Sequence, residues 1–524
     1  MRRATTWVLA ALLACVGVLL VSAFDAERGG SSAGGAGATI GRIGAPLATE
    51  SARARVAYTG PRHLHGRTLL RARVLASGPR VVAVTFLLDG EPLGTDTTAP
   101  YSLDVDASRI RAGRHKLRVA AVDRLGGRTA TRPLRVRTSA EPTGVLAASP
   151  SGGLDRALDA LARGHVTVRL APGRYVVPHL EMGSGARLEG AGPRTVLAAG
   201  AAGWSLLTLR GHGVRLSDLT IDGGRRVERA IGVAGGSHDV RIQRVRMGGV
   251  LQTGVEVWGE HSEVSIQDSA ITGSDASGAG VFELGSDESR DMSVIRTRIS
   301  GFRSHGINFA QRFYGRPAAA RRGLALDNRI SAIDDPDADR GTHEGAIWSG
   351  GVEAAIIGNR IRDTGWDGIQ TVGSSRGVTV VDNDIARTPV GIYLEHETNA
   401  SLFAGNRIAD VATGINVEWR YDDAGSSGNT FERNTIVRPT DAGLFVDVEG
   451  DRNRIEANVV AGGSGPAVVL QGASRNVVTR NVACERGGEE LVVQQSAHHD
   501  DGRAAHSLAN RLEGNAAAEA CPAP

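Results

Sequence analysis

The sequence predicts an all-β protein in which a β-solenoid follows an antiparallel β-sandwich. The solenoid is indicated by an asparagine-led phrase that returns every 23 to 31 residues in the C-terminal part of the chain. A second phrase, a glycine followed by alternating apolar residues, comes after most copies of the first, and no helical periodicity accompanies either. Repeats of this length without helices are typical of a solenoid built from β-strands. The composition agrees, because 70 glycines and only 4% aromatic residues suit tightly turned coils.

The asparagines of the first phrase are expected to stack at one turn of the solenoid. They are Asn328, Asn359, Asn383, Asn406, Asn434, Asn458 and Asn481. Looser copies of the phrase extend upstream to Asp218, which gives about eleven coils. At the strand spacing of about 4.8 Å, stacked amide side chains can hydrogen-bond one another and the turn backbone. We therefore predict a structural ladder here.

Residues 1–23 have the features of a secretory signal peptide. Two arginines precede an apolar run from Trp7 to Val21, and a small-residue cleavage site follows. Two alternatives stay open, an uncleaved membrane anchor and lipid attachment at Cys15. Residues 24–52 are predicted to form a flexible linker, because glycine, serine and alanine are frequent in them. We expect a secreted or cell-surface protein that touches a membrane only if the signal segment stays uncleaved.

Residues 53–138 are predicted to form the β-sandwich, because short alternating segments are separated by turn residues such as Asp89-Gly90. The predicted strands are Thr68–Leu75, Val81–Leu88, Tyr101–Val105, Lys116–Val122 and Leu134–Arg137. The phrases Val84-Thr-Phe-Leu-Leu-Asp-Gly90 and Thr98-Ala-Pro-Tyr101 resemble the bacterial immunoglobulin-like modules of exported carbohydrate-active enzymes and surface proteins. The resemblance implies a spacer or a weak binding module.

Residues 139–164 are expected to contain a linker and then a short amphipathic helix, since Leu154 and Leu161 are spaced for one helix face. This helix should cap the solenoid, which is predicted to span residues 165–515. Its opening phrase, Ala171-Pro-Gly-Arg-Tyr175, resembles the first coils of the right-handed parallel β-helix, or pectate-lyase-like, superfamily. The resemblance implies the fold, whereas the activity stays open because this fold hosts lyases, hydrolases, epimerases and non-catalytic adhesins.

Residues 516–524 are predicted to form a C-terminal tail held by a disulfide bond. Once the signal peptide is removed, Cys484 and Cys521 are the only cysteines, an even pair in an exported protein. The end of a solenoid exposes an unpaired strand edge, which a tethered tail can cover. The net charge of +3 gives no indication of a nucleic-acid partner, and we expect a monomer.

The candidate site lies on three glycine-led strands that align without a gap. Each strand carries a carboxylate four residues after its glycine, namely Glu395, Glu418 and Asp447. Unpaired like charges on adjacent strands would repel one another, raise a pKa or require a cation between them. Aromatic side chains beside carboxylates suit sugar rings. The expected substrate-binding residues are Tyr393, Asn416, Trp419, Tyr421, Trp348, Trp366 and Gln370, and His396 and Arg420 join the carboxylates as catalytic candidates.

Three insertions beside these coils are expected to form the banks of a groove. They are Gln311–Arg322, Asp334–His343 and Tyr421–Gly428.

Three mechanisms stay open at this site. Two carboxylates on neighbouring strands can act as general acid and base in glycoside hydrolysis, which requires no cofactor. In a polyuronate lyase or a uronan C5-epimerase, the three carboxylates would instead hold Ca²⁺ while Arg420, Tyr421 or His396 handled the C5 proton. Lys116 is the only lysine in the chain, so lyases that need a lysine base are excluded.

The leading hypothesis is an exported polysaccharide-active protein, a lyase or a glycoside hydrolase, whose extracellular glycan can contain uronate. The alternatives are a non-catalytic glycan-binding adhesin, a uronan C5-epimerase, and a rigid stalk without a ligand. A stalk should lack a local cluster of carboxylates, aromatic residues and arginine, and this sequence has one.

Overall fold

The computed structural model describes residues 55–75, 78–139, 145–274, 277–285, 289–309, 322–334, 344–418, 425–485, 491–498 and 503–522. The predicted signal peptide and the whole predicted linker therefore lie outside the described residues. Among the residues that are described, no helix is long and apolar enough to cross a membrane. Residues 52–524 form one compact unit that contains both the sandwich and the solenoid.

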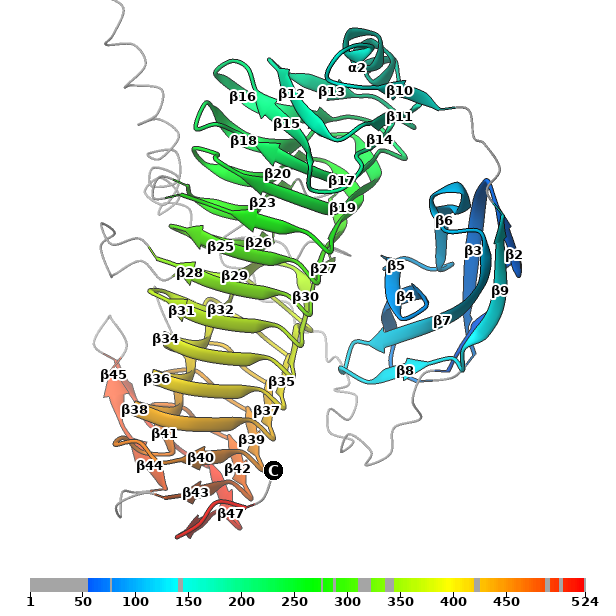
Figure 1. The fold of residues 1–524 in the computed structure, drawn as a ribbon. Helices are drawn as coiled ribbons and strands as arrows, with labels where there is room; N and C mark the ends of the chain where they lie inside the picture. The colour runs from blue at the N-terminus through cyan, green and yellow to red at the C-terminus, as the bar shows by residue number, and fades with distance from the viewer. Residues whose placement is uncertain are drawn as a thin grey trace, which may run out of the picture. The chain divides into compact units, whose positions relative to one another are not determined.

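The solenoid is a single parallel system of 37 strands, from β10 (Leu146–Ala148) to β48 (Ala516–Ala518), wound in about 13 turns (Figure 1). The sequence repeat gave about eleven coils because it was traced back only to Asp218, whereas the solenoid begins before that residue. The capping helix is present as α2 (Leu154–Arg163), and its Ala157 and Leu161 pack into the solenoid core. The amphipathic spacing of the sequence thus placed the helix correctly.

Each complete coil contributes strands to three parallel sheets. Sheet 1 contains β13 (Leu180–Met182), β16 (Gly203–Leu209), β18 (Val227–Val233), β20 (Thr253–Gly259), β23 (Ala279–Gly285), β26 (His305–Phe309), β29 (Gly345–Gly350), β32 (Asp367–Val372), the second halves of β34 (Asp384–Leu394), β36 (Arg407–Val417) and β38 (Thr435–Val446), β41 (Val468–Gln471) and β44 (Val492–Gln495). Sheet 2 includes β21 (His261–Gln267), β24 (Arg290–Ile295), β27 (Arg322–Leu326), β30 (Glu353–Ile357), β33 (Thr379–Val381), β35 (Leu402–Ala404), β37 (Thr430–Glu432), β39 (Arg454–Glu456) and β42 (Val477–Thr479). Sheet 3 includes β12 (Gly173–Val177), β28 (Arg329–Ile333), β31 (Arg360–Thr364), the first halves of β34, β36 and β38, and β40 (Val459–Ala461) and β43 (Val482–Cys484).

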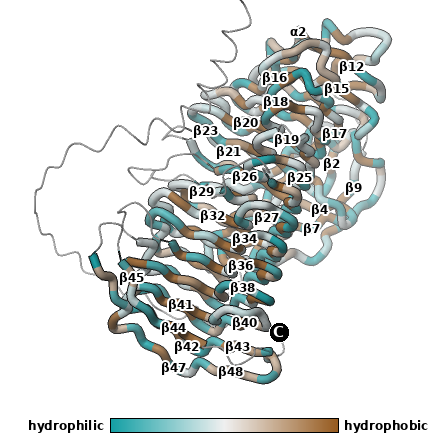
Figure 2. The backbone as a smooth tube through the Cα atoms, turned by 90° about the vertical axis from the view of Figure 1, so that its left-hand side faces the viewer, coloured by the Kyte–Doolittle hydropathy of each residue, from teal (hydrophilic) through white to brown (hydrophobic). Residues whose placement is uncertain are grey.

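The core is the stack of inward-facing side chains along this parallel system. Ile392, Ile415 and Leu444 pair rung by rung and are at most 1% exposed, as the alternation in the sequence predicted. Hydrophobic stretches recur coil after coil along β34, β36 and β38 (Figure 2). The glycine that leads each sheet 1 strand is also explained, because a Cβ atom on Gly391 would lie 2.5 Å from the carbonyl oxygen of Gly414 on the next coil.

The predicted asparagine ladder is confirmed at the turn between sheets 2 and 3. Each side-chain oxygen accepts from the main-chain N–H and the side-chain amide of the preceding asparagine, at 2.9–3.0 Å. Asn515 adds an eighth member. A second ladder, which the sequence analysis missed, runs through Asn429, Asn453, Asn476 and Asn510 at the entrance to sheet 2.

The N-terminal sandwich consists of two sheets. One contains β1 (Val56–Tyr58), β3 (Arg67–Val74) and β6 (Ser102–Asp106), and the other contains β2 (His63–His65), β9 (Leu134–Ser139), β7 (Gly113–Asp123), β4 (Val81–Leu88), β5 (Glu91–Asp96) and β8 (Arg128–Ala130). A single turn of 3-10 helix, η1 (Ala107–Arg109), follows β6. The five predicted strands are present, and the Asp89-Gly90 turn has the two positive φ angles that a tight hairpin requires.

The sandwich packs on the outer side of sheet 2. Gln267, fully buried on β21, accepts a hydrogen bond from the main-chain N–H of Thr95 at 2.9 Å and donates one to its carbonyl at 2.6 Å. Arg128 forms a bidentate pair with Asp327 at 2.7 and 3.0 Å. An apolar cluster joins the two parts and consists of Val82, Ala83, Val122, Ile295, Leu324, Leu326, Ala355 and Ile357. These contacts fix the module on sheet 2, whereas the candidate site lies on sheet 1.

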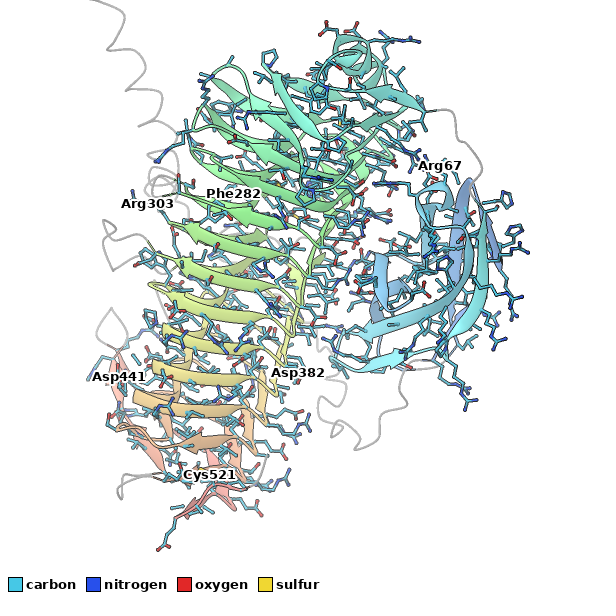
Figure 3. All side chains as sticks on the ribbon, in the orientation of Figure 1. Arg67, Phe282, Arg303, Asp382, Asp441 and Cys521 are labelled. Atoms are coloured by element: carbon cyan, nitrogen blue, oxygen red, sulfur yellow. A yellow bond between two sulfur atoms is a disulfide. The ribbon has the colours of Figure 1, made fainter. Side chains whose placement is uncertain are left out.

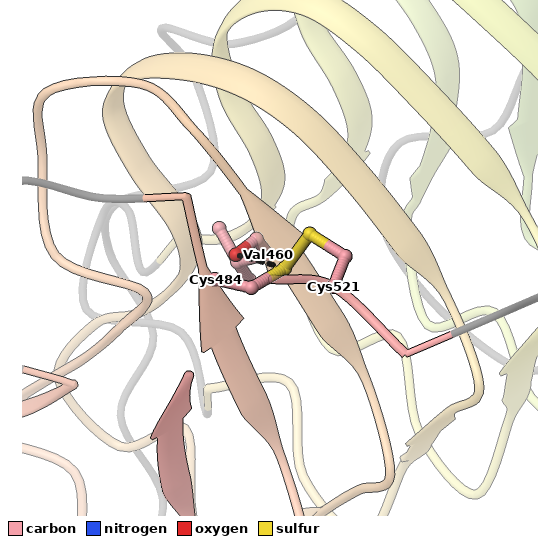
Figure 4. Close-up of a disulfide and its surroundings, with 3 residues drawn as sticks. All are labelled: Val460, Cys484 and Cys521. Atoms are coloured by element: carbon pink, nitrogen blue, oxygen red, sulfur yellow. Dashed lines mark hydrogen bonds between the residues drawn. A yellow bond between two sulfur atoms is a disulfide. The ribbon is translucent and has the colours of Figure 1, made fainter. Parts of the chain in front are cut away.

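The predicted disulfide joins Cys484 on β43 to Cys521, with Cα atoms 5.1 Å apart (Figure 4). It ties the C-terminal end to a buried strand of a late coil. The last rung continues to Ala518 through β48, three residues past the predicted end of the solenoid.

Candidate functional site

One outward-facing row of side chains runs along sheet 1, one residue from each coil. In register order it contains Thr208, Gly232, Glu256, Phe282, Asn308, Trp348, Gln370, Tyr393, Asn416, Phe445 and Val469. One member of this row, Phe282 on β23, is labelled in Figure 3. We call it the first outer row. Its central part brings Trp348, Gln370, Tyr393 and Asn416 together on consecutive rungs, as the sequence analysis expected.

The three predicted carboxylates form a second outer row, two residues further along each strand. The main-chain N–H of Glu418 donates to Leu394 at 2.9 Å and that of Asp447 donates to Val417 at 2.8 Å, so the rungs stay in register to the end of the strands. The row runs from Glu395 through Glu418 and Asp447 to Gln471 and Gln495. The gap-free alignment inferred from the sequence is therefore correct.

Each carboxylate of the second outer row accepts a hydrogen bond from a side-chain amide. Gln370 donates to Glu395 at 3.2 Å and Asn416 donates to Glu418 at 3.4 Å. Asp447 accepts from Gln471 at 3.2 Å. These donors lower the cost of stacking like charges at the rung spacing of about 4.8 Å.

Glu395 and His396 form the most buried ionisable pair of this region. The Nε2 atom of His396 lies 3.2 Å from Oε1 of Glu395, and the two residues are only 7% and 6% exposed. The backbone of His396 and Glu397 has positive φ angles of 50° and 65°, and the carbonyl of His396 accepts from Ser374 at 2.8 Å. The turn that ends this rung thus holds an imidazole against a carboxylate, an arrangement suited to moving a proton.

Several buried polar atoms along the first outer row have no hydrogen-bond partner among the described residues. Both amide atoms of Asn308, which is 0% exposed, belong to this group. Oε1 of Gln370 and Oδ1 of Asn416 belong to it as well. Because a buried unpaired polar group costs about 1–3 kcal/mol, a series of them along one face indicates a place where a polar ligand supplies the missing partners.

Asn308 was missed by the sequence analysis although a signal for it existed. The phrase Gly306-Ile-Asn-Phe309 matches the glycine-led phrase that starts at Gly391, and the two stand at the same register position. The intervening insertions concealed this match, because they break the even spacing of the repeat.

Two expectations about the aromatic residues are corrected. Trp366 faces inward as part of the core cluster, and its Nε1 donates to the carbonyl of Arg303 at 2.9 Å. It precedes β32 at a corner, where the alternation of a strand does not apply. Tyr393 was expected to line a groove, yet it is 0% exposed, and the neighbouring Trp348 is 2% exposed.

The remaining predicted site residues, Trp419, Arg420 and Tyr421, lie outside the described residues, as do 311–321, 335–343 and most of the third insertion. Their expected roles stay predictions. Within the described ranges, no group of three or more histidine, cysteine, aspartate or glutamate side chains could hold a metal ion. The Ca²⁺ site predicted at Glu395, Glu418 and Asp447 stays untested.

Comparison with known proteins agrees with both parts of the fold. Residues 323–517 match the family model described as periplasmic copper-binding protein (NosD), and residues 63–119 match a bacterial Ig domain. No curated protein sequence matches the chain. The A-module of the mannuronan C-5 epimerase AlgE6 of Azotobacter vinelandii is similar in structure, with 19% identity, a TM-score of 0.50, and coverage of 62% of this chain and 93% of that one.

A second solved structure with this likeness is the family 28 exopolygalacturonase of Yersinia enterocolitica. It has 12% identity and a TM-score of 0.49, and the match covers 88% of this chain and 99% of that one. At these identities the likeness concerns the fold alone. The chain contains a bacterial immunoglobulin-like domain followed by a parallel β-helix.

Proposed function

We propose that this protein is exported and cleaves an extracellular polysaccharide along the outer rows of sheet 1. The observation that carries the proposal is the series of buried, unpaired amide atoms at Asn308, Gln370 and Asn416 on the first outer row. Sugar hydroxyl groups both donate and accept hydrogen bonds, so they can satisfy such atoms.

The catalytic groups would be the carboxylates of the second outer row. Glu395 and Glu418 stand one rung apart, about 4.8 Å, whereas Glu395 and Asp447 stand two rungs apart, about 9.6 Å. The first separation suits a retaining glycosidase and the second an inverting one. His396, paired with Glu395, would assist proton transfer. Elimination from a uronate is the other route, with Ca²⁺ held between the carboxylates.

Uronan epimerisation is a second candidate, favoured by the presence of Tyr393 and the Glu395–His396 pair at neighbouring positions. A C5-epimerase must remove a proton from one face of the ring and return one to the other, which requires two such groups. The similar structure named as a mannuronan C-5 epimerase supports this candidate only as a likeness of fold.

The test is incubation of the protein with neutral glycans and polyuronates, followed by measurement of new reducing ends, ultraviolet-absorbing unsaturated ends and uronate epimer content. Reducing ends without unsaturation indicate hydrolysis, both signals together indicate elimination, and epimer exchange without cleavage indicates epimerisation. No change in any substrate, together with retained binding, would contradict the proposal and favour a glycan-binding adhesin.

Glu418→Gln is the diagnostic variant, because it keeps the side-chain shape but removes the charge. Turnover should fall at least a hundredfold while the melting temperature changes little. Asp363→Asn is the matched control, since this carboxylate lies on sheet 3 and its side chain is 56% exposed. Full activity of Glu418→Gln on a substrate that the wild type cleaves would place the chemistry elsewhere.

A further inference from the structure

Trp204 is an exposed aromatic side chain on the same sheet as the covered Trp348 and Tyr393. It lies on β16, near the capped end of the solenoid, and is 64% exposed, compared with 2% for Trp348. A large apolar ring open to solvent loses the stabilisation that burial would give it. The position of the ring is nevertheless fixed by a neighbouring side chain.

The guanidinium of Arg229 holds the Trp204 ring in place. Its carbon atom lies 4.2 Å from the ring centroid, within the range of a cation–π contact. Arg229 is itself only 6% exposed, and its Nε donates to Glu256 at 2.5 Å. The ring therefore rests on a cation that is anchored by a buried carboxylate.

A second indole ring, that of Trp258, lies on β20, one coil beyond the strand β18 that carries Arg229. A Cβ atom on Gly232 would lie 2.5 Å from ring carbons of Trp258 and 3.0 Å from Oγ of Ser205. Only glycine at this position of the first outer row lets the Trp258 ring lie across the sheet. Trp204 and Trp258 thus approach the Arg229 rung from its two sides.

Polar atoms of this area have unused hydrogen-bonding capacity. Nη1 of Arg229, Oε2 of Glu228 and Oγ of Ser205 have no hydrogen-bond partner among the described residues, and Nη1 lies 3.5 Å from the Glu228 oxygen. An uncharged hydroxyl group between them could accept from the guanidinium and donate to the carboxylate. This Nη1, which forms an ion pair but no hydrogen bond, belongs to a side chain that is 7% exposed, so the site is built into the sheet.

The charge of this area selects against an acidic ligand. Glu228 and Glu256 outnumber Arg229, so the ionised cluster carries one net negative charge. Burial raises the pKa of Glu228, Arg229 opposes the rise, and Glu256 adds to it. A uronate carboxylate would add like charge, whereas a neutral sugar ring would stack and hydrogen-bond without that cost.

We propose that Trp204, Trp258, Arg229 and Glu228 form a non-catalytic subsite for an uncharged sugar residue of a long polysaccharide. The inference rests on the proposed function in that the same chain would continue along sheet 1 to the carboxylate row. Trp204 and Glu395 are separated by seven rungs, about 34 Å. Only a polymer can occupy both places, so the subsite contributes to affinity for long substrates and not to the chemical step.

The test uses Trp204→Ala, with Trp204→Phe as the conservative variant. The control is Val176→Ala on β12, an apolar side chain that is 61% exposed on sheet 3. Binding to soluble neutral glucans, xylans and mannans, and to alginate and polygalacturonate, is measured by affinity electrophoresis and titration. Trp204→Ala should weaken binding of a neutral polymer about tenfold, while Trp204→Phe and Val176→Ala should bind as the wild type does.

Kinetics provide a readout that a structural defect would not reproduce. On a polymer that the wild type cleaves, Trp204→Ala should raise KM with kcat unchanged, and it should not affect oligosaccharides too short to span seven rungs. Bound neutral polymer should also protect Trp204 from oxidation by N-bromosuccinimide, which peptide mass spectrometry can locate.

The outcomes separate this proposal from the proposed function. Unchanged neutral-polymer binding by Trp204→Ala overturns the subsite even if Glu418→Gln abolishes turnover. Weakened binding by Trp204→Ala supports the subsite even if Glu418→Gln stays active. Tighter binding of alginate or polygalacturonate than of every neutral glycan overturns the charge argument, and failure of the wild type to bind any glycan overturns the subsite altogether.

Discussion

Replacing Asn406 by alanine should destabilise the solenoid at its centre. This residue is 1% exposed, and its Nδ2 donates to the carbonyl of Val380 and to Oδ1 of Asn434, both at 2.9 Å. Its Oδ1 accepts from the main-chain N–H and the side-chain amide of Asn383 at 3.0 Å. Alanine keeps none of these four bonds.

The magnitude follows from the groups left behind. The Asn383 N–H and the Val380 carbonyl both lose a partner in a buried turn, and each such loss costs about 1–3 kcal/mol. We expect a loss of about 2–5 kcal/mol in the free energy of unfolding. Asn383 Nδ2 adds less, because it also donates to the carbonyls of Ile356 and Val381.

The assay is urea unfolding followed by far-ultraviolet circular dichroism and by hydrogen exchange at the neighbouring turns. Asn515→Ala is the matched control, because Asn515 accepts the same two bonds from Asn481 but lies, half-buried, at the end of the ladder. Water can replace its bonds, so its loss should be smaller. A central variant that unfolds like the wild type, or no earlier than Asn515→Ala, would refute the ladder as a stabilising element.

Three further outcomes are expected. Ala457→Gly should stabilise the protein by up to about 1 kcal/mol, measured by melting temperature, because Ala457 has a φ of 54° at a position that Gly358, Gly405 and Gly514 occupy in other coils. Gln267→Leu should expose the Thr95 amide to faster hydrogen exchange, because the buried bonds that fix the sandwich on sheet 2 are lost; unchanged exchange would count against that contact. The unreduced, denatured protein should yield no free thiol at Cys484 and Cys521, and two titratable thiols would disprove the bond.

The sequence predicted the solenoid and its main ladder because both depend on local, repeated chemistry. An asparagine after a tight turn and a glycine against the next carbonyl recur at fixed positions, so one coil explains the others. The second ladder was missed in the sequence, although Asn429, Asn453, Asn476 and Asn510 each stand five residues before a member of the first. Only one asparagine per coil was followed, so the second one in the late coils was overlooked.

The sequence predicted which residues of the candidate site stand opposite one another on neighbouring rungs, but it did not predict how deeply each side chain is buried. Alternation along β34 correctly turned Tyr393 away from Ile392, yet it could not show that Tyr393 would be fully covered. Alternation also failed at Trp366, since the residue stands at a corner between two strands. Exposure depends on tertiary surroundings, which the periodicity of a single strand does not contain.

The amide donors explain how a repeating fold can tolerate a row of carboxylates. Identical rungs stack identical groups, so a charged position that repeats is penalised unless a neighbour compensates. Here Gln370, Asn416 and Gln471 each give one hydrogen bond to a carboxylate, although each uses a different geometry: the next rung, the same strand and the preceding rung. Because the three amide donors reach their carboxylates in three different ways, the repeat of the coil does not by itself produce these hydrogen bonds. The oxygen atoms of Gln370 and Asn416 stay unpaired in the process, so the same amides that stabilise the charges face outward with acceptors that a sugar hydroxyl can use.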